Sequence, residues 1–127
     1  MTTVREVMTA ELVVVSPSVN LIEASREMST RRVGSVLVMV EGSLLGIFTE
    51  RDILRALSSS SSADAARVSH VERWMTGEPT TTDPDVTVGA ALDVMLSSGF
   101  RHLPVVEEGT VIGVVSMRDL VRTMSKG

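Results

Sequence analysis

Two short segments of the sequence each place a hydroxyl side chain three residues before an aspartate. They are Gly-Ile-Phe-Thr-Glu-Arg-Asp at 46–52 and Gly-Val-Val-Ser-Met-Arg-Asp at 113–119. A hydroxyl can donate a hydrogen bond to a phosphate, and a carboxylate can accept two from the vicinal hydroxyls of a ribose. These residue types therefore indicate recognition of a phosphorylated sugar, with the acid facing the sugar because it would repel a phosphate.

The same spacing has a second explanation that involves no ligand. A Thr or Ser followed three residues later by an acid is the pattern of a capping box, in which two side chains close the start of a helix. A helix start also presents free N–H groups and partial positive charge, which suit a phosphate. At Thr49–Asp52 and at Ser116–Asp119 both explanations stay open, and a carboxylate has enough lone pairs to serve both roles.

Apolar spacing predicts the elements that position the first segment. Branched apolar residues predict strands, and helical spacing predicts helices on either side of them. The predicted strands are Leu12–Val15, Ser35–Val40 and Leu44–Phe48, and the predicted helices are Asn20–Arg31 and Glu50–Leu57. A hairpin turn at Glu41-Gly42-Ser43 joins the last two strands, with Gly42 free to take positive φ. Thr49 therefore ends a strand, and Asp52 lies in the first turn of a helix.

The second half of the chain repeats the first, since residues 71–124 align with residues 4–57 without a gap. The corresponding strands are predicted at Thr80–Thr82, His102–Val106 and Val111–Val115, and a helix that carries Leu120, Val121 and Met124 follows them. We divide the chain into repeat one at 1–57, a flexible Ser-rich linker at 58–70 and repeat two at 71–127.

The predicted fold class is α/β, of the α+β type. Two pseudo-symmetric β-α-β-β-α repeats are expected to pack sheet to sheet with their helices outside, since each repeat alone is too small for an ample core. Such symmetry would place two equivalent clefts along the seam between the repeats. A hydrophobic fraction of 43% with only 2% aromatics predicts a core of Val, Leu, Ile, Met and Ala.

Composition and motifs argue against several classes of function. A net charge of −4, without a basic stripe, disfavours nucleic acid as a partner. The N-terminus has no signal-peptide pattern, and no apolar run is long enough for a membrane span, which together predict a cytoplasmic protein. The sequence has no cysteine, no metal-ligand spacing and no Ser-His-Asp constellation. We therefore predict no catalytic residues, no metal, no required cofactor and no enzymatic activity.

Taken together and in order, the repeated motifs resemble a tandem pair of cystathionine-β-synthase (CBS) domains, the Bateman module. The matching segments are 4–9, 46–54, 71–76, 100–106 and 113–120. The resemblance covers everything except the linker and the extreme ends. It implies regulatory binding of an adenosine-containing ligand: AMP, ADP or ATP, or in some members S-adenosylmethionine or NAD.

The resemblance also implies which residues form each site. A site in such pairs takes its hydroxyl and aspartate from one repeat and contacts adenine with the first two strands of the other. Site one would then comprise Thr49, Asp52, Thr80, Arg101, His102 and Pro104. Site two would comprise Ser116, Asp119, Val13, Val33, Gly34 and Ser35.

The two sites differ in charge, because Arg101 and His102 of site one correspond to Gly34 and Ser35 of site two. We therefore expect site one to bind an adenine nucleotide more tightly, and site two to bind weakly or to prefer a less charged adenosine ligand.

A second class of function is a homodimerisation or protein-interaction module that needs no ligand. Trp74 is interpreted as a core residue, with a buried interface as the alternative. The family resemblance implies homodimers packed through exposed helix faces, and action in trans on a regulated protein that the residues do not identify.

Overall fold

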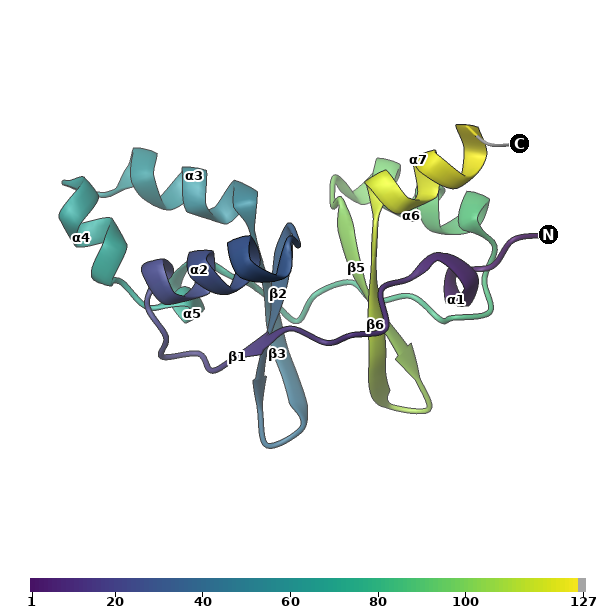
Figure 1. Ribbon diagram of the computed structural model, residues 1–127, viewed down its shortest axis with the longest axis horizontal. Coiled ribbons are helices and arrows are strands. Elements are labelled where there is room, and N and C mark those ends of the chain that lie inside the picture. Colours follow the sequence, from purple (N-terminus) through teal and green to yellow (C-terminus); the bar gives the residue numbers. More distant parts are fainter. Residues whose placement is uncertain (126–127) are drawn as a thin grey trace. The chain divides into compact units, whose positions relative to one another are not determined.

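The computed structural model describes residues 1–125, and the chain forms two compact units (Figure 1). The central unit comprises Val13–Pro79. The terminal unit joins Met1–Leu12 to the chain from Thr80 onward. The compact units therefore do not coincide with the two sequence repeats, because each unit takes its last piece from the start of the other repeat.

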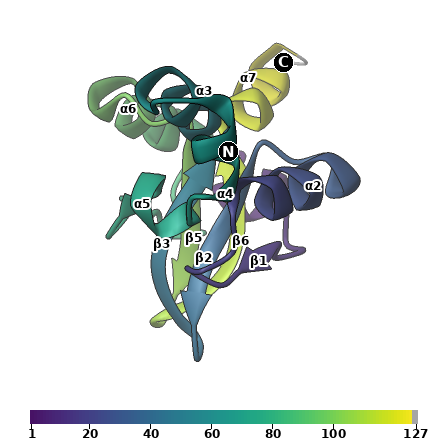
Figure 2. The same ribbon diagram turned by 90° about the vertical axis from the view of Figure 1, so that its left-hand side faces the viewer.

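The central unit is built on one four-stranded sheet in the order β1-β2-β3-β4. β1 is parallel to β2, and the other neighbouring strands are antiparallel. Its strands are β1 (Val14–Val15), β2 (Ser35–Val40), β3 (Ser43–Thr49) and β4 (Thr76–Gly77). Its helices are α2 (Leu21–Arg31), α3 (Glu50–Ser59), α4 (Ala63–Val68) and α5 (Val71–Trp74) (Figure 2).

The terminal unit repeats this arrangement in a reduced form. Its elements are α1 (Val4–Val7), α6 (Val88–Ser98), β5 (His102–Glu107), β6 (Thr110–Ser116) and α7 (Met117–Ser125). β5 and β6 form an antiparallel pair. Single bridges take the places of the outer strands: Thr82 pairs in parallel with Val105, and Thr9 pairs antiparallel with Val114.

The predicted mixed α/β fold with two repeats is confirmed, and the long helices and hairpins lie where apolar spacing placed them. Asn20 caps α2, because its side chain accepts a hydrogen bond from the Glu23 amide (2.9 Å). Both hairpins turn through two residues of positive φ, including Gly42 at 81°. The predicted strand at Thr80–Thr82 is reduced to the bridge at Thr82, because the backbone hydrogen bonds that join this segment to β5 are made by Thr82, whose amide donates to the Pro104 carbonyl and whose carbonyl accepts from the Val106 amide (2.9 Å each).

The serine-rich segment differs from the flexible linker that its composition predicts. Ser58 and Ser59 extend α3, and Ala63–Val68 forms α4. The Ser62 hydroxyl caps α4 by accepting from the Ala65 amide (3.0 Å), and Ala66 is fully buried. The alanines favour a helix, so one capping serine is enough to start it.

Each unit has its own apolar core. The central core includes Phe48, Leu21, Ala24 and Trp74, which is 8% exposed. Trp74 donates through Nε1 to the Ser69 hydroxyl (3.1 Å), so its interpretation as a core residue is confirmed. The fully buried residues of the terminal core are Val4, Met95, Leu103, Val105, Val115 and Leu120.

A glycine in each hairpin allows a segment from the start of a repeat to approach the strand closely. A Cβ at Gly46 would lie 2.6 Å from Met75 Sδ and 2.6 Å from the Thr76 carbonyl oxygen. A Cβ at Gly113 would meet Met8 and Thr9 in the same way, at 2.8 Å from each. The glycines that the repeats share at these positions are therefore explained by packing.

Charge also ties the N-terminal segment to the terminal unit. Arg5 forms ion pairs with Glu107 and with Asp85. The hydrogen bond to Glu107 and then that to Asp85 raise the pKa of the Arg5 guanidinium above its ordinary value. The pairs are exposed, so they orient the segment more than they stabilise it.

Candidate functional site

The first hydroxyl–acid pair lies where β3 ends and α3 begins. The Thr49 amide donates to Asp52 Oδ2 (2.9 Å), and the Thr49 hydroxyl lies within hydrogen-bonding distance of the same oxygen (3.2 Å). Asp52 is only 4% exposed, although it carries a carboxylate. This carboxylate oxygen therefore closes the start of α3, and capping is the role that the contacts show.

The second pair has the same geometry where β6 ends and α7 begins. The Ser116 amide and hydroxyl both donate to Asp119 Oδ2, at 3.0 and 2.8 Å. The Asp119 amide is 3.1 Å from the Ser116 hydroxyl oxygen, which completes a reciprocal capping box. Since these bonds use one carboxylate oxygen, the other oxygen is left for further hydrogen bonds.

An arginine that the sequence analysis did not single out joins the first pair. Arg55 Nη1 donates to Asp52 Oδ1 (2.7 Å) and to the Trp74 carbonyl oxygen (3.2 Å). Arg55 remains 54% exposed at its side chain, whereas that of Asp52 is 5% exposed. The sequence does carry a signal for this ion pair, because an acid and an arginine three residues apart on a helix lie on one face.

Two of the site-two residues of the central unit, Gly34 and Ser35, lie at the start of α3. Ser35 pairs with Thr49 across the hairpin, and the Gly34 carbonyl accepts from the Glu50 amide (3.2 Å). Val13 is 9% exposed and belongs to the central core, against which Val33 packs. The structure thus brings residues predicted for site two beside the Thr49–Asp52 pair of site one.

Two of the site-one residues of the terminal unit, Arg101 and His102, lie at the start of α7. The Arg101 carbonyl accepts from the Met117 amide (2.8 Å), and His102 pairs with Ser116. The Pro104 carbonyl accepts from the Thr82 amide (2.9 Å), and Thr80, two residues before Thr82, is exposed. Arg101 and His102 therefore share a unit with Ser116–Asp119, and the predicted combination of residues from both repeats stays a prediction.

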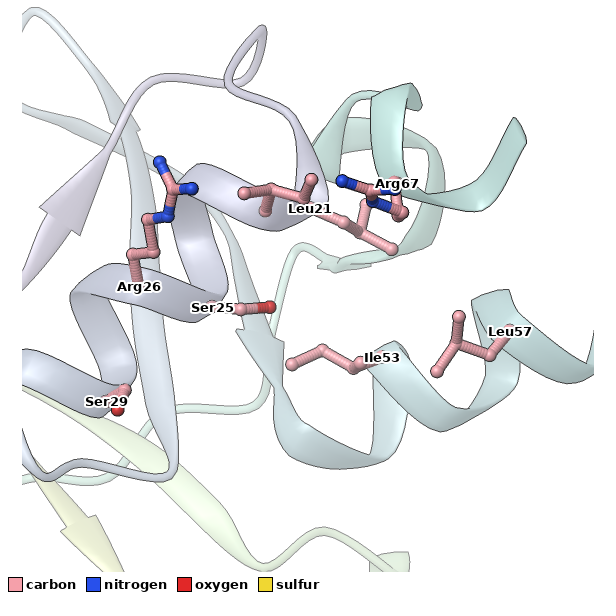
Figure 3. Close-up of a pocket in the computed structure, with 8 residues that line it drawn as sticks. Leu21, Ser25, Arg26, Ser29, Ile53, Leu57 and Arg67 are labelled. Atoms are coloured by element: carbon pink, nitrogen blue, oxygen red, sulfur yellow. The ribbon is translucent and has the colours of Figure 1, made fainter. Parts of the chain in front are cut away.

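A pocket of about 340 Å³, which the sequence does not predict, opens between α2, α3 and α4 (Figure 3). Ser25 of α2 points toward Ile53 of α3, and Arg67 of α4 lies on the far side of the pocket (Figure 3). The other lining residues are Leu21, Ile22, Arg26, Ser29 and Leu57. No predicted site residue lines the pocket, and its apolar walls suit a phosphorylated sugar poorly. Without a predicted helix at α4, no sequence signal could have found it.

Across residues 1–125, no group of three or more His, Asp or Glu side chains is arranged to hold a metal ion. None of the helices within that range combines the length and the apolar character that crossing a membrane requires.

Comparison with known proteins places the chain in a family. The sequence profile of the CBS domain matches residues 4–59 and again residues 68–126. A 17.7 kDa protein of Acidianus ambivalens is 40% identical over 125 residues, which are 97% of this chain and 73% of that protein.

Solved structures agree with this relationship. The CBS-domain-containing protein ATU1752 from Agrobacterium tumefaciens superimposes with a TM-score of 0.90 at 31% identity, over 97% of this chain and 99% of that one. CBSX2, solved in complex with AMP, superimposes with a TM-score of 0.80 at 25% identity, over 99% of this chain and 98% of that one. The chain belongs to the CBS-domain family, as a tandem pair of CBS domains that forms a Bateman module.

Proposed function

We propose that this Bateman module is regulatory rather than catalytic and that it binds an adenosine-containing ligand through its two hydroxyl–acid pairs. The observation that carries this proposal is the doubled placement of Thr49–Asp52 and Ser116–Asp119, each at the start of a helix that follows a strand. The structure of CBSX2 with AMP supports it, because that chain has the same fold over 99% of this one.

The chemistry of each pair suits a ribose beside a phosphate. Oδ1 of Asp52 or Asp119 lies opposite the oxygen that caps the helix, so it accepts sugar hydroxyls without breaking the cap. The free N–H groups in the first turns of α3 and α7 attract a phosphate one group away. AMP, ADP and ATP meet both requirements, and S-adenosylmethionine and NAD also carry the ribose.

The two sites are proposed to differ in affinity. Site one combines Thr49 and Asp52 with Thr80, Arg101, His102 and Pro104, as the family resemblance implies. Site two combines Ser116 and Asp119 with Val13, Val33, Gly34 and Ser35. Because Arg101 adds positive charge and His102 adds a hydrogen-bond donor, site one is the tighter site for a nucleotide.

A ligand-independent homodimerisation module is the second candidate, and one observation favours it. Exposed apolar residues recur at matching positions of the last helix in each repeat: Leu54 and Leu57 on α3, and Val121 and Met124 on α7. Their exposed fractions of 68%, 47%, 50% and 54% leave two apolar faces that a second copy could cover. A ligand would act on such a dimer, or on a regulated protein in trans, only by binding one conformation better than another.

A thermal melting panel separates the two candidates. AMP, ADP, ATP, S-adenosylmethionine and NAD are each added to the full chain, and the melting temperature is recorded. A ligand at a hundredfold excess over its Kd stabilises the folded state by about 2.7 kcal/mol, which raises the melting temperature by several degrees. A module that only dimerises would instead melt at a temperature that depends on protein concentration and on none of the five compounds.

A further inference from the structure

The Asp52 carboxylate already has three donors in the structure. The Thr49 amide and hydroxyl occupy Oδ2, and Arg55 occupies Oδ1. An ionised carboxylate has about four acceptor positions, and the vicinal hydroxyls of a ribose would add two more donors. A ribose therefore cannot bind Asp52 with two hydrogen bonds until one present donor leaves.

Arg55 is the donor best placed to leave. The amide of Thr49 is fixed by the backbone, and the Thr49 hydroxyl also accepts from the Asp52 amide in the capping box that closes the start of α3. The Arg55 side chain is 54% exposed, and its second contact is a carbonyl oxygen, that of Trp74. The guanidinium can therefore turn toward solvent or toward a ligand while the helix cap stays intact.

Breaking the contact between Arg55 and Asp52 costs free energy, and the ligand determines how much of that cost is offset. Asp52 is 5% exposed at its side chain, so without Arg55 its charge would be buried and unpaired. A ligand phosphate offers the guanidinium a new anionic partner, often with two parallel hydrogen bonds. An uncharged nucleoside offers no such partner, so its ribose must displace Arg55 without compensation.

The equivalent carboxylate in the terminal unit is arranged differently. Both Ser116 donors lie on Oδ2 of Asp119. Within residues 1–125, the structure records no hydrogen bond to Oδ1 of Asp119. A ribose can therefore bind that oxygen without first displacing a guanidinium.

We propose that Arg55 determines the charge preference of the Thr49–Asp52 site: it exchanges its contact with Asp52 for one with the ligand phosphate, and so selects phosphorylated adenosine over adenosine itself. This inference rests on the proposed function, because it assumes that Asp52 binds the ribose. It identifies Arg55 as a specificity-determining residue for a nucleoside monophosphate or polyphosphate.

Isothermal titration with two probes, AMP and adenosine, tests the proposal. The parent is the full chain with Asp119→Ala, so that the Thr49–Asp52 site is observed alone. In this parent we compare Arg55→Met, Arg55→Gln and Arg55→Lys, with Arg122→Met as the control at the matching position of the other repeat. Melting curves without ligand confirm that each variant is folded.

In the neutral variants, Arg55→Met and Arg55→Gln, AMP affinity should fall about tenfold or more, because a charge-assisted hydrogen bond is lost. Adenosine affinity should stay the same or rise, since its ribose no longer competes with a guanidinium. Arg55→Lys should keep most of the preference for AMP, and Arg122→Met should leave both affinities unchanged.

Equal losses for AMP and adenosine, or no change for either, would overturn the role of Arg55 while the proposed function stands. A parent that binds neither probe, beside a wild-type chain that binds AMP, would also overturn it, because the Thr49–Asp52 site would then be inactive. If the wild-type chain itself binds neither probe, the proposed function fails and this inference fails with it.

Discussion

Individual residues in this fold hold the proposed site in place through packing and hydrogen bonds. Asp52 and Asp119 each close the start of a helix with one oxygen, so the carboxylate is oriented before any ligand arrives. Preorganisation of this kind lowers the cost of binding, because no side chain has to be ordered in the complex. Gly46 and Gly113 serve the same regions by admitting the neighbouring chain against the strands that lead to Thr49 and Ser116.

The role of the hairpin glycines leads to a stability prediction. Gly46→Ala should lower the free energy of unfolding by about 1–3 kcal/mol, because the new Cβ would lie 2.6 Å from a backbone oxygen that cannot move aside. Gly77→Ala is the control, since the nearest atom to its Cβ would be the Leu45 carbonyl oxygen at 3.9 Å. Urea denaturation of both variants measures the difference, and equal losses would contradict the packing argument.

At the scale of elements, the linker between the repeats is part of the central unit. α4 contacts both α2 and α3, and Ala66 is fully buried in the central core. The serines on either side act in capping and anchoring: Ser62 caps α4, and Ser69 accepts from Trp74. A segment of low complexity thus contributes to the core through one alanine side chain, that of Ala66.

Substitutions at two adjacent alanines of α4 test this placement. Ala66→Lys should destabilise the chain by about 2 kcal/mol or more, because a cation would be forced into the core. Ala65→Lys adds the same side chain at an exposed position and should change stability by no more than about 0.5 kcal/mol. A flexible linker would tolerate both substitutions equally, and thermal melting distinguishes the two cases.

The sequence predicts those elements that carry a periodic apolar pattern. Helix α2 and the hairpin strands were predictable because branched residues and Gly42 leave few alternatives. Helix α4 was missed because a run of serines outweighs a short alanine pattern in any compositional argument. The strand expected at Thr80–Thr82 forms only a single bridge, because three threonines have β propensity but no apolar pattern that fixes which of them pairs.

The candidate site was predictable to the same partial extent. The spacing of hydroxyl and acid revealed both pairs, because a capping box is a local pattern. The contact of Arg55 with Trp74 joins residues far apart in the sequence, so only the structure could show it. The pocket beside α4 depends on a helix that the sequence analysis did not predict.

At the scale of the whole chain, the two repeats exchange their first segments. Val4 is fully buried in the terminal core, and Thr9 exchanges two backbone hydrogen bonds with Val114 (2.9 and 3.0 Å). Met75 and Thr76, from the start of the second repeat, occupy the equivalent place against Gly46 in the central unit. A single repeat taken from the sequence would therefore lack part of the core of its own unit.

Hydrogen exchange tests this assignment of the N-terminal segment. Val4→Asp should increase exchange in β6 and α7 of the terminal unit and leave β3 and α3 of the central unit protected, because Val4 belongs to the terminal core. Glu6→Asp is the control: it leaves an acidic side chain at an exposed position of the segment and should change the protection of neither unit. Loss of protection that begins in β3 or α3 would contradict the exchanged arrangement.

The central claim is that the aspartates at the starts of α3 and α7 each hold a ribose, and calorimetric titration of AMP tests it most directly. The wild-type chain should bind AMP, and Asp52→Ala should cost more affinity than Asp119→Ala. The double variant should bind no AMP, since both acceptors of the sugar hydroxyls are gone. If the folded double variant binds AMP as tightly as the wild type, the carboxylates do no more than cap their helices, and the account is wrong.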